Sequence, residues 1–292
     1  MKQGAQDRRT ATAVTDRDIE IVRWLGRHRL ATAEQVMRRF EMQRSKAYQR
    51  LAVLVAAGLV RHEPGVRSPR VYLATSAGLA GAKLDLPRAT VSAASFAHDV
   101  ALVDVAIPLE RAGHNVCSER EIRRHTSDDG SNPFQLRLLG SGSDARGAWP
   151  DLALVDHCAR TITAIEVELT LKKAERLAGK LTAYVASNYA RVIYLCDKEP
   201  VAQAVRAQAA RVGMAPRVEV KPLSTDLARE LFSHGRVAQE ESAPETSDDR
   251  AAQLLLEEIA GYLSGDSAVQ QRTLNRWKTL VQTARTHGLL AE

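Results

Sequence analysis

Aromatic residues are scarce in this sequence of 292 residues, at only 4%. Base stacking on exposed rings needs aromatic side chains, so the shortage argues against stacking as the main mode of any nucleic-acid contact. Cysteine is also rare: Cys117, Cys158 and Cys196 are far apart, odd in number and without a CxxC pair. This pattern supports neither a zinc knuckle nor a disulfide framework, and it indicates buried thiols in a reducing cytoplasm.

Long apolar runs are missing as well. No stretch approaches the length of a membrane span, and the first residues, MKQGAQDRRTATAVTDRD, lack the apolar core of a signal peptide. No motif fits a P-loop, a Rossmann turn or a Ser/His/Asp triad. Hydrophobic residues make up 45% and charged residues 26%, as in a globular protein. We therefore expect a cytoplasmic protein without a membrane partner.

Positive charge is concentrated at the start of the chain. Residues 1–88 hold 17 Lys and Arg against 8 Asp and Glu, whereas the rest hold 24 against 27. A basic segment of this kind predicts a polyanionic partner.

The chain divides into segments of different pattern. Apolar spacing and capping residues predict a helix from Thr15 or Asp16, a second with a capping box at Thr32, and a third that ends near Gly58. Two short strands around a Pro/Gly turn and a helix from Ser76 follow. The expected divisions are a disordered N-terminus (1–14), a basic domain (15–86), a mixed α/β or α+β domain (93–235), an acidic linker (236–250) and C-terminal helices (251–292). These last helices could pack on the body of the protein or form a homodimer contact.

The order of elements over 15–86 resembles the winged helix-turn-helix. TAEQVMRRF is similar to its second helix, SKAYQRLAVLVAAGLV to its recognition helix and RHEPGVRSPRVYLAT to its wing. The resemblance implies binding to double-stranded DNA, with side chains at the start of the recognition helix facing base edges. The candidates are Gln43, Arg44, Ser45, Lys46, Tyr48 and Gln49, with Arg50 placed for phosphate and Arg61, Arg67 and Arg70 on the wing.

The second domain reads as α-β-loop-β-β-α-β-α-β. Its first helix spans Ala93–Ala112, and Pro108 is expected to kink or end it. NVCSEREIRR is expected to be a strand, from which Glu119 or Glu121 could point toward the next strands. The stretch PDLALVDHCARTITAIEVELTLKK then reads as a hairpin with HCAR as its loop. If so, paired positions sum to 317, and Asp151, Glu166 and Glu168 share one face.

Pro150-Asp151 on one strand and Glu166-Val167-Glu168 on the next resemble the PD-(D/E)xK nucleases. The resemblance implies that Asp151, Glu166 and Glu168 bind Mg²⁺ or Mn²⁺, which prefer such oxygen ligands. Glu168 stands where that superfamily usually has lysine, so the cation would come from Lys173 or Lys180 on the next helix. An ion-paired strand edge is the alternative. His98, on the preceding helix, is treated as an ordinary histidine.

Over residues 15–195 the chain resembles the replication-relaxation proteins of plasmids, phages and integrated elements. The stretches FAHDVALVDVA, SEREIR and PDLAL…IEVELTLKKAERLAGKLTAY carry this likeness. It implies DNA binding in replication, mobilisation or control of a mobile element, and it supplies no reaction. Three functions stay open: a DNA-binding regulator with a degenerate nuclease-like domain, a targeted metal-dependent endonuclease, and a protein-interaction scaffold.

Overall fold

The computed structural model describes residues 13–63, 69–126, 131–137 and 148–231. The predictions for the acidic linker, for the C-terminal helices and for Arg67 lie outside the described residues, as does nearly all of segment 1–14. Within the described ranges, no helix is both long enough and apolar enough to cross a membrane.

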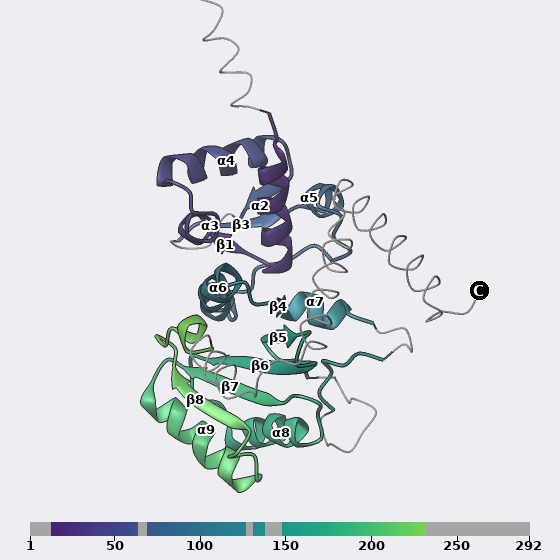
Figure 1. The fold of residues 1–292 in the computed structure, drawn as a ribbon. Helices are drawn as coiled ribbons and strands as arrows, with labels where there is room; N and C mark the ends of the chain where they lie inside the picture. The colour runs from purple at the N-terminus through teal and green to yellow at the C-terminus, as the bar shows by residue number, and fades with distance from the viewer. Residues whose placement is uncertain (1–12, 64–68, 127–130, 138–147, 232–292) are drawn as a thin grey trace, which may run out of the picture. The chain divides into compact units, whose positions relative to one another are not determined.

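Three helices open the described chain, in the predicted order (Figure 1). Thr15 and Thr32 each accept a hydrogen bond from the backbone N–H three residues later, and that residue's side chain returns the bond, which closes a capping box. The helices are α2 (Asp16–Arg27), α3 (Ala33–Phe40) and α4 (Arg44–Ala56).

A small antiparallel sheet packs beside these helices. Strands β2 (Val60–His62) and β3 (Val71–Ala74) form the predicted hairpin, and β1 (Ala31–Thr32) pairs with the other edge of β3. Gly58 ends α4 with a φ of +71°, a left-handed conformation that favours glycine. Helix α5 (Ser76–Gly81) follows, capped by Thr75 rather than by Ser76.

Helix α6 (Phe96–Arg111) begins the second half of the described chain, which runs from α6 to β8, and it continues past Pro108. Proline was expected to kink or end this helix, because it lacks an N–H and its ring crowds the preceding turn. Its neighbours Ile107 and Leu109 are both buried. Packing on either side of the proline thus holds the last turn in place.

The residues of NVCSEREIRR form a strand only at β4 (Val116–Ser118), which corrects the prediction of a longer strand. From Glu119 the chain turns into α7 (Glu119–Arg124). The reason is a capping box, in which Ser118 and Glu121 exchange hydrogen bonds with each other's backbone N–H. Glu119 and Glu121 therefore lie on a helix.

A five-stranded sheet forms the centre of the second half, in the order β4-β5-β6-β7-β8. The first three strands are antiparallel, and β6, β7 and β8 run parallel. Apart from α7, the order of elements is the predicted one. The elements are β5 (Leu152–Asp156), β6 (Thr161–Glu168), α8 (Ala174–Val185), β7 (Arg191–Cys196), α9 (Glu199–Arg211) and β8 (Val218–Pro222).

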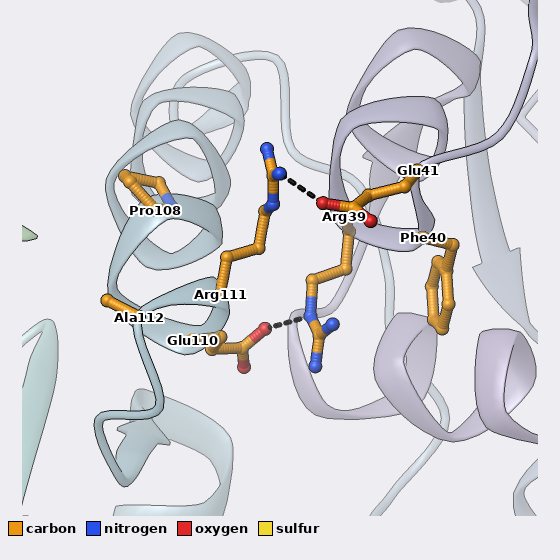
Figure 2. Close-up of a pocket in the computed structure, with 7 residues that line it drawn as sticks. All are labelled: Arg39, Phe40, Glu41, Pro108, Glu110, Arg111 and Ala112. Carbon is orange, nitrogen blue, oxygen red and sulfur yellow. Dashed lines mark hydrogen bonds and ion pairs between the residues drawn. The ribbon is translucent and has the colours of Figure 1, made fainter.

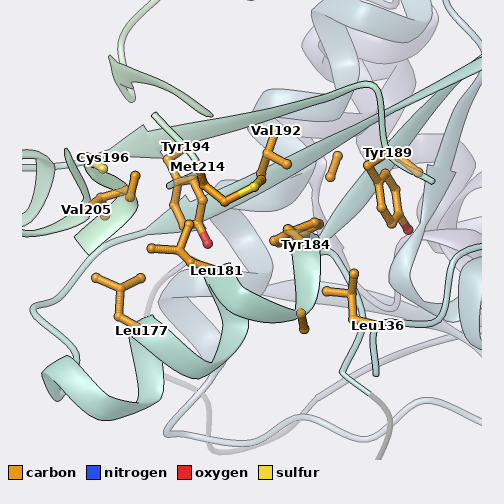
Figure 3. Close-up of a cluster of buried hydrophobic side chains, with 14 of the residues drawn as sticks. Leu136, Leu177, Leu181, Tyr184, Tyr189, Val192, Tyr194, Cys196, Val205 and Met214 are labelled. Carbon is orange, nitrogen blue, oxygen red and sulfur yellow. The ribbon is translucent and has the colours of Figure 1, made fainter. Parts of the chain in front are cut away.

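Helices cover both faces of this sheet (Figure 1). Helices α8 and α9 pack against one face, and α6 contacts β4 and β6 from the other. Figure 3 shows Leu177, Leu181 and Tyr184 of α8 beside Val192 and Tyr194 of β7. This apolar layer leaves a buried setting for any polar group on the same face of β6.

Glu110, near the end of α6, links the two halves. Its buried carboxylate accepts hydrogen bonds from Trp24 Nε1 at 2.7 Å, Arg27 Nη1 at 3.2 Å and Arg39 Nε at 2.7 Å, and it contacts His28 Nε2 at 2.9 Å. Figure 2 shows the contact of Glu110 with Arg39. Burial alone would raise the pKa of Glu110, but these partners outweigh it and lower the pKa to about 2.

Candidate functional site

The outward face of α4 carries the predicted DNA-contacting side chains. Ala47, Leu51 and Leu54 point inward at helical spacing and are fully buried. The opposite face is exposed and begins at the N-cap residue Gln43. Its exposed members are Gln43, Arg44, Ser45, Lys46, Tyr48 and Gln49.

This face of α4, which we call the α4 face, is basic. No acidic residue occurs anywhere in α4. Tyr48 is 42% exposed, and the Arg44 guanidinium lies 5.8 Å from the centre of its ring. That distance suits a cation–π contact, which orients the arginine side chain on the surface.

Arg50 does not belong to the α4 face, which corrects the prediction that it contacts phosphate. Its guanidinium is buried and paired with Asp18 of α2, with Nε donating to Oδ1 at 2.8 Å, and Nη2 donates to the Ala13 carbonyl. Arg50 instead fastens α4 to α2, since a buried charge needs a partner.

The predicted wing arginines are placed differently from one another. Arg70 is exposed just before β3. Arg61 on β2 is half-buried, pairs with Glu63, and donates from Nη2 to the Ala89 carbonyl at 2.9 Å. It therefore ties the hairpin to the segment that follows α5.

The hairpin of β5 and β6 has the predicted register, because Asp156 pairs with Thr161 and Leu152 with Ile165. Just before β5, the Asp151 carboxylate accepts a hydrogen bond from Val167 N–H at 2.8 Å. Glu166 pairs with Tyr194 across β6 and β7, so it lies on the face that α8 covers. The structure thus brings Asp151 to the strand that carries both glutamates.

Lys180 supplies the cation that the sequence lacks on the strand. From α8 its ammonium donates to one carboxylate oxygen of Glu166, and the Tyr184 hydroxyl donates to the other. Glu166 is 0% exposed, so burial and the charge of Asp151 raise its pKa in spite of Lys180. Lys173, the other predicted lysine, is exposed at the N-cap of α8.

Glu168 has a partner that sequence reasoning missed. Lys172 donates to this buried carboxylate from four residues further along the chain. The signal was present in the sequence, because Lys172 follows Glu168 by only four positions. Nearby, the buried Tyr194 hydroxyl has no hydrogen-bond partner among the described residues.

His98 also has a larger part than expected. Its Nε2 lies 3.3 Å from Asp151 Oδ1, which brings α6 against the start of β5. Burial alone would lower the pKa of His98, but the hydrogen bond and charge of Asp151 raise it. Conversely, Lys180, His98 and the Val167 N–H outweigh burial and lower the pKa of Asp151 to about 2.

The two glutamates of α7 have different surroundings. Glu121 pairs with Arg27 at 2.6 Å and accepts hydrogen bonds from the backbone N–H and the hydroxyl of Ser118. Glu119 pairs with Arg29 at 3.3 Å and Arg123 at 2.6 Å, and it borders a cavity of about 630 Å³. The wall of this carboxylate cavity is mixed: apolar side chains line it together with His98, Asp151, Glu168, Lys172, Arg176 and Lys180.

The arrangement does not fit a divalent cation as it stands. Both oxygens of Glu166 accept bonds from Lys180 and Tyr184, and Glu168 accepts one from Lys172. Among the residues that the structure describes, no three His, Cys, Asp or Glu side chains are grouped so that they could hold a metal ion. A cation there would have to displace the lysines.

The chain matches a known protein family. A family model described as replication-relaxation matches residues 22–200, which is more than half of the chain and includes both α4 and the carboxylate cavity. No curated protein matches the chain.

Proposed function

Because the chain belongs to the replication-relaxation family, we propose that it binds double-stranded DNA through the α4 face. It would do so in the replication, mobilisation or transcription control of a mobile element. The observation that carries this proposal is the α4 face itself, an exposed run of basic and amide side chains on a helix with no acidic residue.

The surroundings of α4 support the same proposal. Helix α3 precedes it, the Arg50–Asp18 pair fixes it to α2, and the β2–β3 hairpin follows it. A helix held in this way presents its first turns to the major groove, where Arg and Gln side chains can read base edges. Arg70, exposed beside the hairpin, is available to a neighbouring phosphate.

The test compares two double variants of the full chain. Arg44→Ala with Lys46→Ala removes two charges from the α4 face. Arg206→Ala with Arg211→Ala removes two exposed charges from α9 and serves as the control. The probe is a fluorescein-labelled 30-base-pair duplex of mixed sequence, and binding is followed by anisotropy from 50 to 300 mM NaCl.

Each lost phosphate contact should reduce the slope of log K against log salt by about 0.9. We expect a reduction of about 1 to 2 for the α4 variant and none for the α9 control. If a site selected from random sequence is used instead, loss of one base contact should cost about 1–3 kcal/mol. Equal binding by the α4 variant and the unaltered protein would refute the proposal.

Metal-dependent DNA cleavage is the second candidate function. The convergence of Asp151, Glu166 and Lys180 beside a cavity favours it. The pairing of both glutamates with lysines opposes it, because those oxygens are occupied. Cleavage therefore ranks below binding.

Supercoiled plasmid incubated with Mg²⁺ or Mn²⁺ tests the second candidate. Nicking that is lost in both Asp151→Ala and Glu166→Ala, and retained in Lys173→Ala, would establish it. Salt-sensitive duplex binding without any nicking would leave the chain a DNA-binding protein with a non-cutting domain.

A further inference from the structure

A second basic site lies away from the α4 face. A cavity of about 380 Å³ opens between α7 and the linker residues 87–90. Five arginines line it and no acidic residue does; we call it the arginine cavity. They are Arg29, Arg88, Arg120, Arg123 and Arg124.

Nearby carboxylates neutralise these arginines only in part. Arg124 pairs with Asp85 at 3.0 Å, but both side chains are more than half exposed, so the pair is weak. Arg29 and Arg123 both pair with Glu119, and Arg29 also lies 3.9 Å from Asp99 Oδ1. No acidic residue lines the cavity itself, so guanidinium N–H groups that these pairs do not use are available to a ligand.

Arg120 and Arg88 are the least satisfied members. Arg120 donates to the Pro87 carbonyl, yet its buried Nε has no hydrogen-bond partner in the described part of the chain. Burial, and after it the charge of Arg29, lower the pKa of Arg120 to about 10. Arg88 is exposed and makes no ion pair with any described residue.

We propose that the arginine cavity binds a phosphate group of a nucleic-acid backbone. Guanidinium forks match phosphate oxygens two at a time, and an anion would relieve the repulsion among the five charges. The geometry of the cavity stands alone, whereas the choice of nucleic acid over another phosphate carrier rests on the proposed function.

Two contacts connect this site with the rest of the binding surface. Arg61 of β2 donates to the Ala89 carbonyl, and Ala89 lines the arginine cavity. Arg123 lines both the arginine cavity and the carboxylate cavity. A nucleic-acid strand held by these arginines would therefore pass close to the carboxylate cavity, which Asp151 lines.

The test uses Arg88→Gln with Arg124→Gln in the full chain. Both side chains are exposed, so the fold should survive. The control is Arg206→Gln with Arg211→Gln on α9. The labelled 30-base-pair duplex is titrated across the same salt range, in parallel with Arg44→Ala/Lys46→Ala.

We expect the slope of log K against log salt to fall by about 1 to 2, and Kd at 0.1 M salt to rise by roughly 10- to 100-fold. An unchanged slope in Arg88→Gln/Arg124→Gln would overturn the arginine cavity as a phosphate site. If the slope still falls in Arg44→Ala/Lys46→Ala, the proposed function stays intact. A reduced slope in Arg88→Gln/Arg124→Gln alone would overturn the α4 face as the DNA-binding surface and support the arginine cavity as a phosphate site. Absence of binding by the unaltered protein at 50 mM salt would overturn both.

A second arm separates the sources of phosphate. Inorganic phosphate replaces chloride at constant ionic strength in the duplex titration. Competition in the unaltered protein that disappears in Arg88→Gln/Arg124→Gln shows a site for a single phosphate group, as in a free nucleotide. Absence of competition, together with the reduced slope, shows that the site needs the polymer.

Discussion

Replacing Lys180 by methionine should destabilise the protein in a pH-dependent way. The change leaves the Glu166 carboxylate fully buried without its cation and beside Asp151. Breaking a buried ion pair by removing one partner costs about 3–5 kcal/mol. Glu166 avoids being charged without a partner if its carboxylate is protonated. The free energy needed to protonate it depends on pH.

The free energy of this protonation can be worked out from the ordinary pKa of glutamate, 4.5. Holding the proton at pH 8 costs about 1.36 kcal/mol for each of roughly 3.5 pH units, or about 5 kcal/mol. At pH 5.5 the unaltered protein already holds this proton, because the pKa of its Glu166 is raised to about 7, so the proton adds nothing to the loss. Because the folded-state pKa is raised, the stability that Glu166 contributes is present below about pH 4.5 and is lost as pH rises through the raised value.

Urea unfolding followed by circular dichroism at pH 5.5 and pH 8 measures the effect. We expect Lys180→Met to lose up to about 3–5 kcal/mol at pH 8. At pH 5.5, where only the hydrogen bond from Lys180 is lost, we expect about 1–2 kcal/mol. Adding Glu166→Gln should recover most of the loss at pH 8, since the amide oxygen still accepts from Tyr184. Lys173→Met, on the exposed N-cap of the same helix, should change stability by less than about 0.5 kcal/mol. A loss independent of pH, or no recovery in the double variant, would refute the reasoning.

Two further predictions concern the contacts that hold the fold. The pKa of Glu110 is lowered from an ordinary 4.5 to about 2. The ionised Glu110 therefore contributes about 3 kcal/mol of stability above about pH 4.5, and this stability is lost as pH falls toward 2. Unfolding at pH 6 and pH 3 should show that stability falls less with acid in Glu110→Gln than in the unaltered protein. In α5, Gly78→Ala should destabilise strongly, because the new Cβ would lie 2.0 Å from the Leu59 carbonyl oxygen, whereas at Gly81 the nearest atom is 4.0 Å away. Gly81→Ala should therefore match or slightly exceed the stability of the unaltered protein in thermal unfolding, since alanine favours a helix by about 1 kcal/mol. Equal melting temperatures for Gly78→Ala and Gly81→Ala would contradict the close packing of Gly78 on the Leu59 carbonyl.

Local signals in the sequence were sufficient where one interaction decides the structure. The capping box at Thr32 marks the start of α3, and the left-handed Gly58 follows the end of α4. The HCAR loop fixed the register of β5 and β6, and with it the approach of Asp151 to the strand of Glu166. In each case the deciding residues lie within a few positions of one another.

Other features depended on competition between signals. Ser118 and Glu121 form a capping box that is visible in the sequence, but the apolar spacing around it favoured a strand. Arg50 follows Ala47 by three positions and precedes Leu54 by four, so it falls on the buried stripe of α4. Its charge suggested exposure, and only the distant Asp18 makes burial tolerable.

The carboxylate cluster shows where sequence reasoning ends. The face shared by Glu166 and Glu168 follows from strand alternation. The choice of Lys180 for Glu166 and of Lys172 for Glu168 depends on how α8 packs over the sheet, which no local pattern specifies. The pair of His98 with Asp151 likewise requires α6 to contact the opposite face.

The contacts of Glu110 have a consequence for any long ligand. One carboxylate at the end of α6 holds side chains from both α2 and α3, and the start of the same helix carries His98 beside Asp151. Helix α6 thus contacts the helices beside α4 at one end and borders the carboxylate cavity at the other. If a duplex binds at the α4 face as proposed, this helix would set how far along that duplex the carboxylate cavity lies.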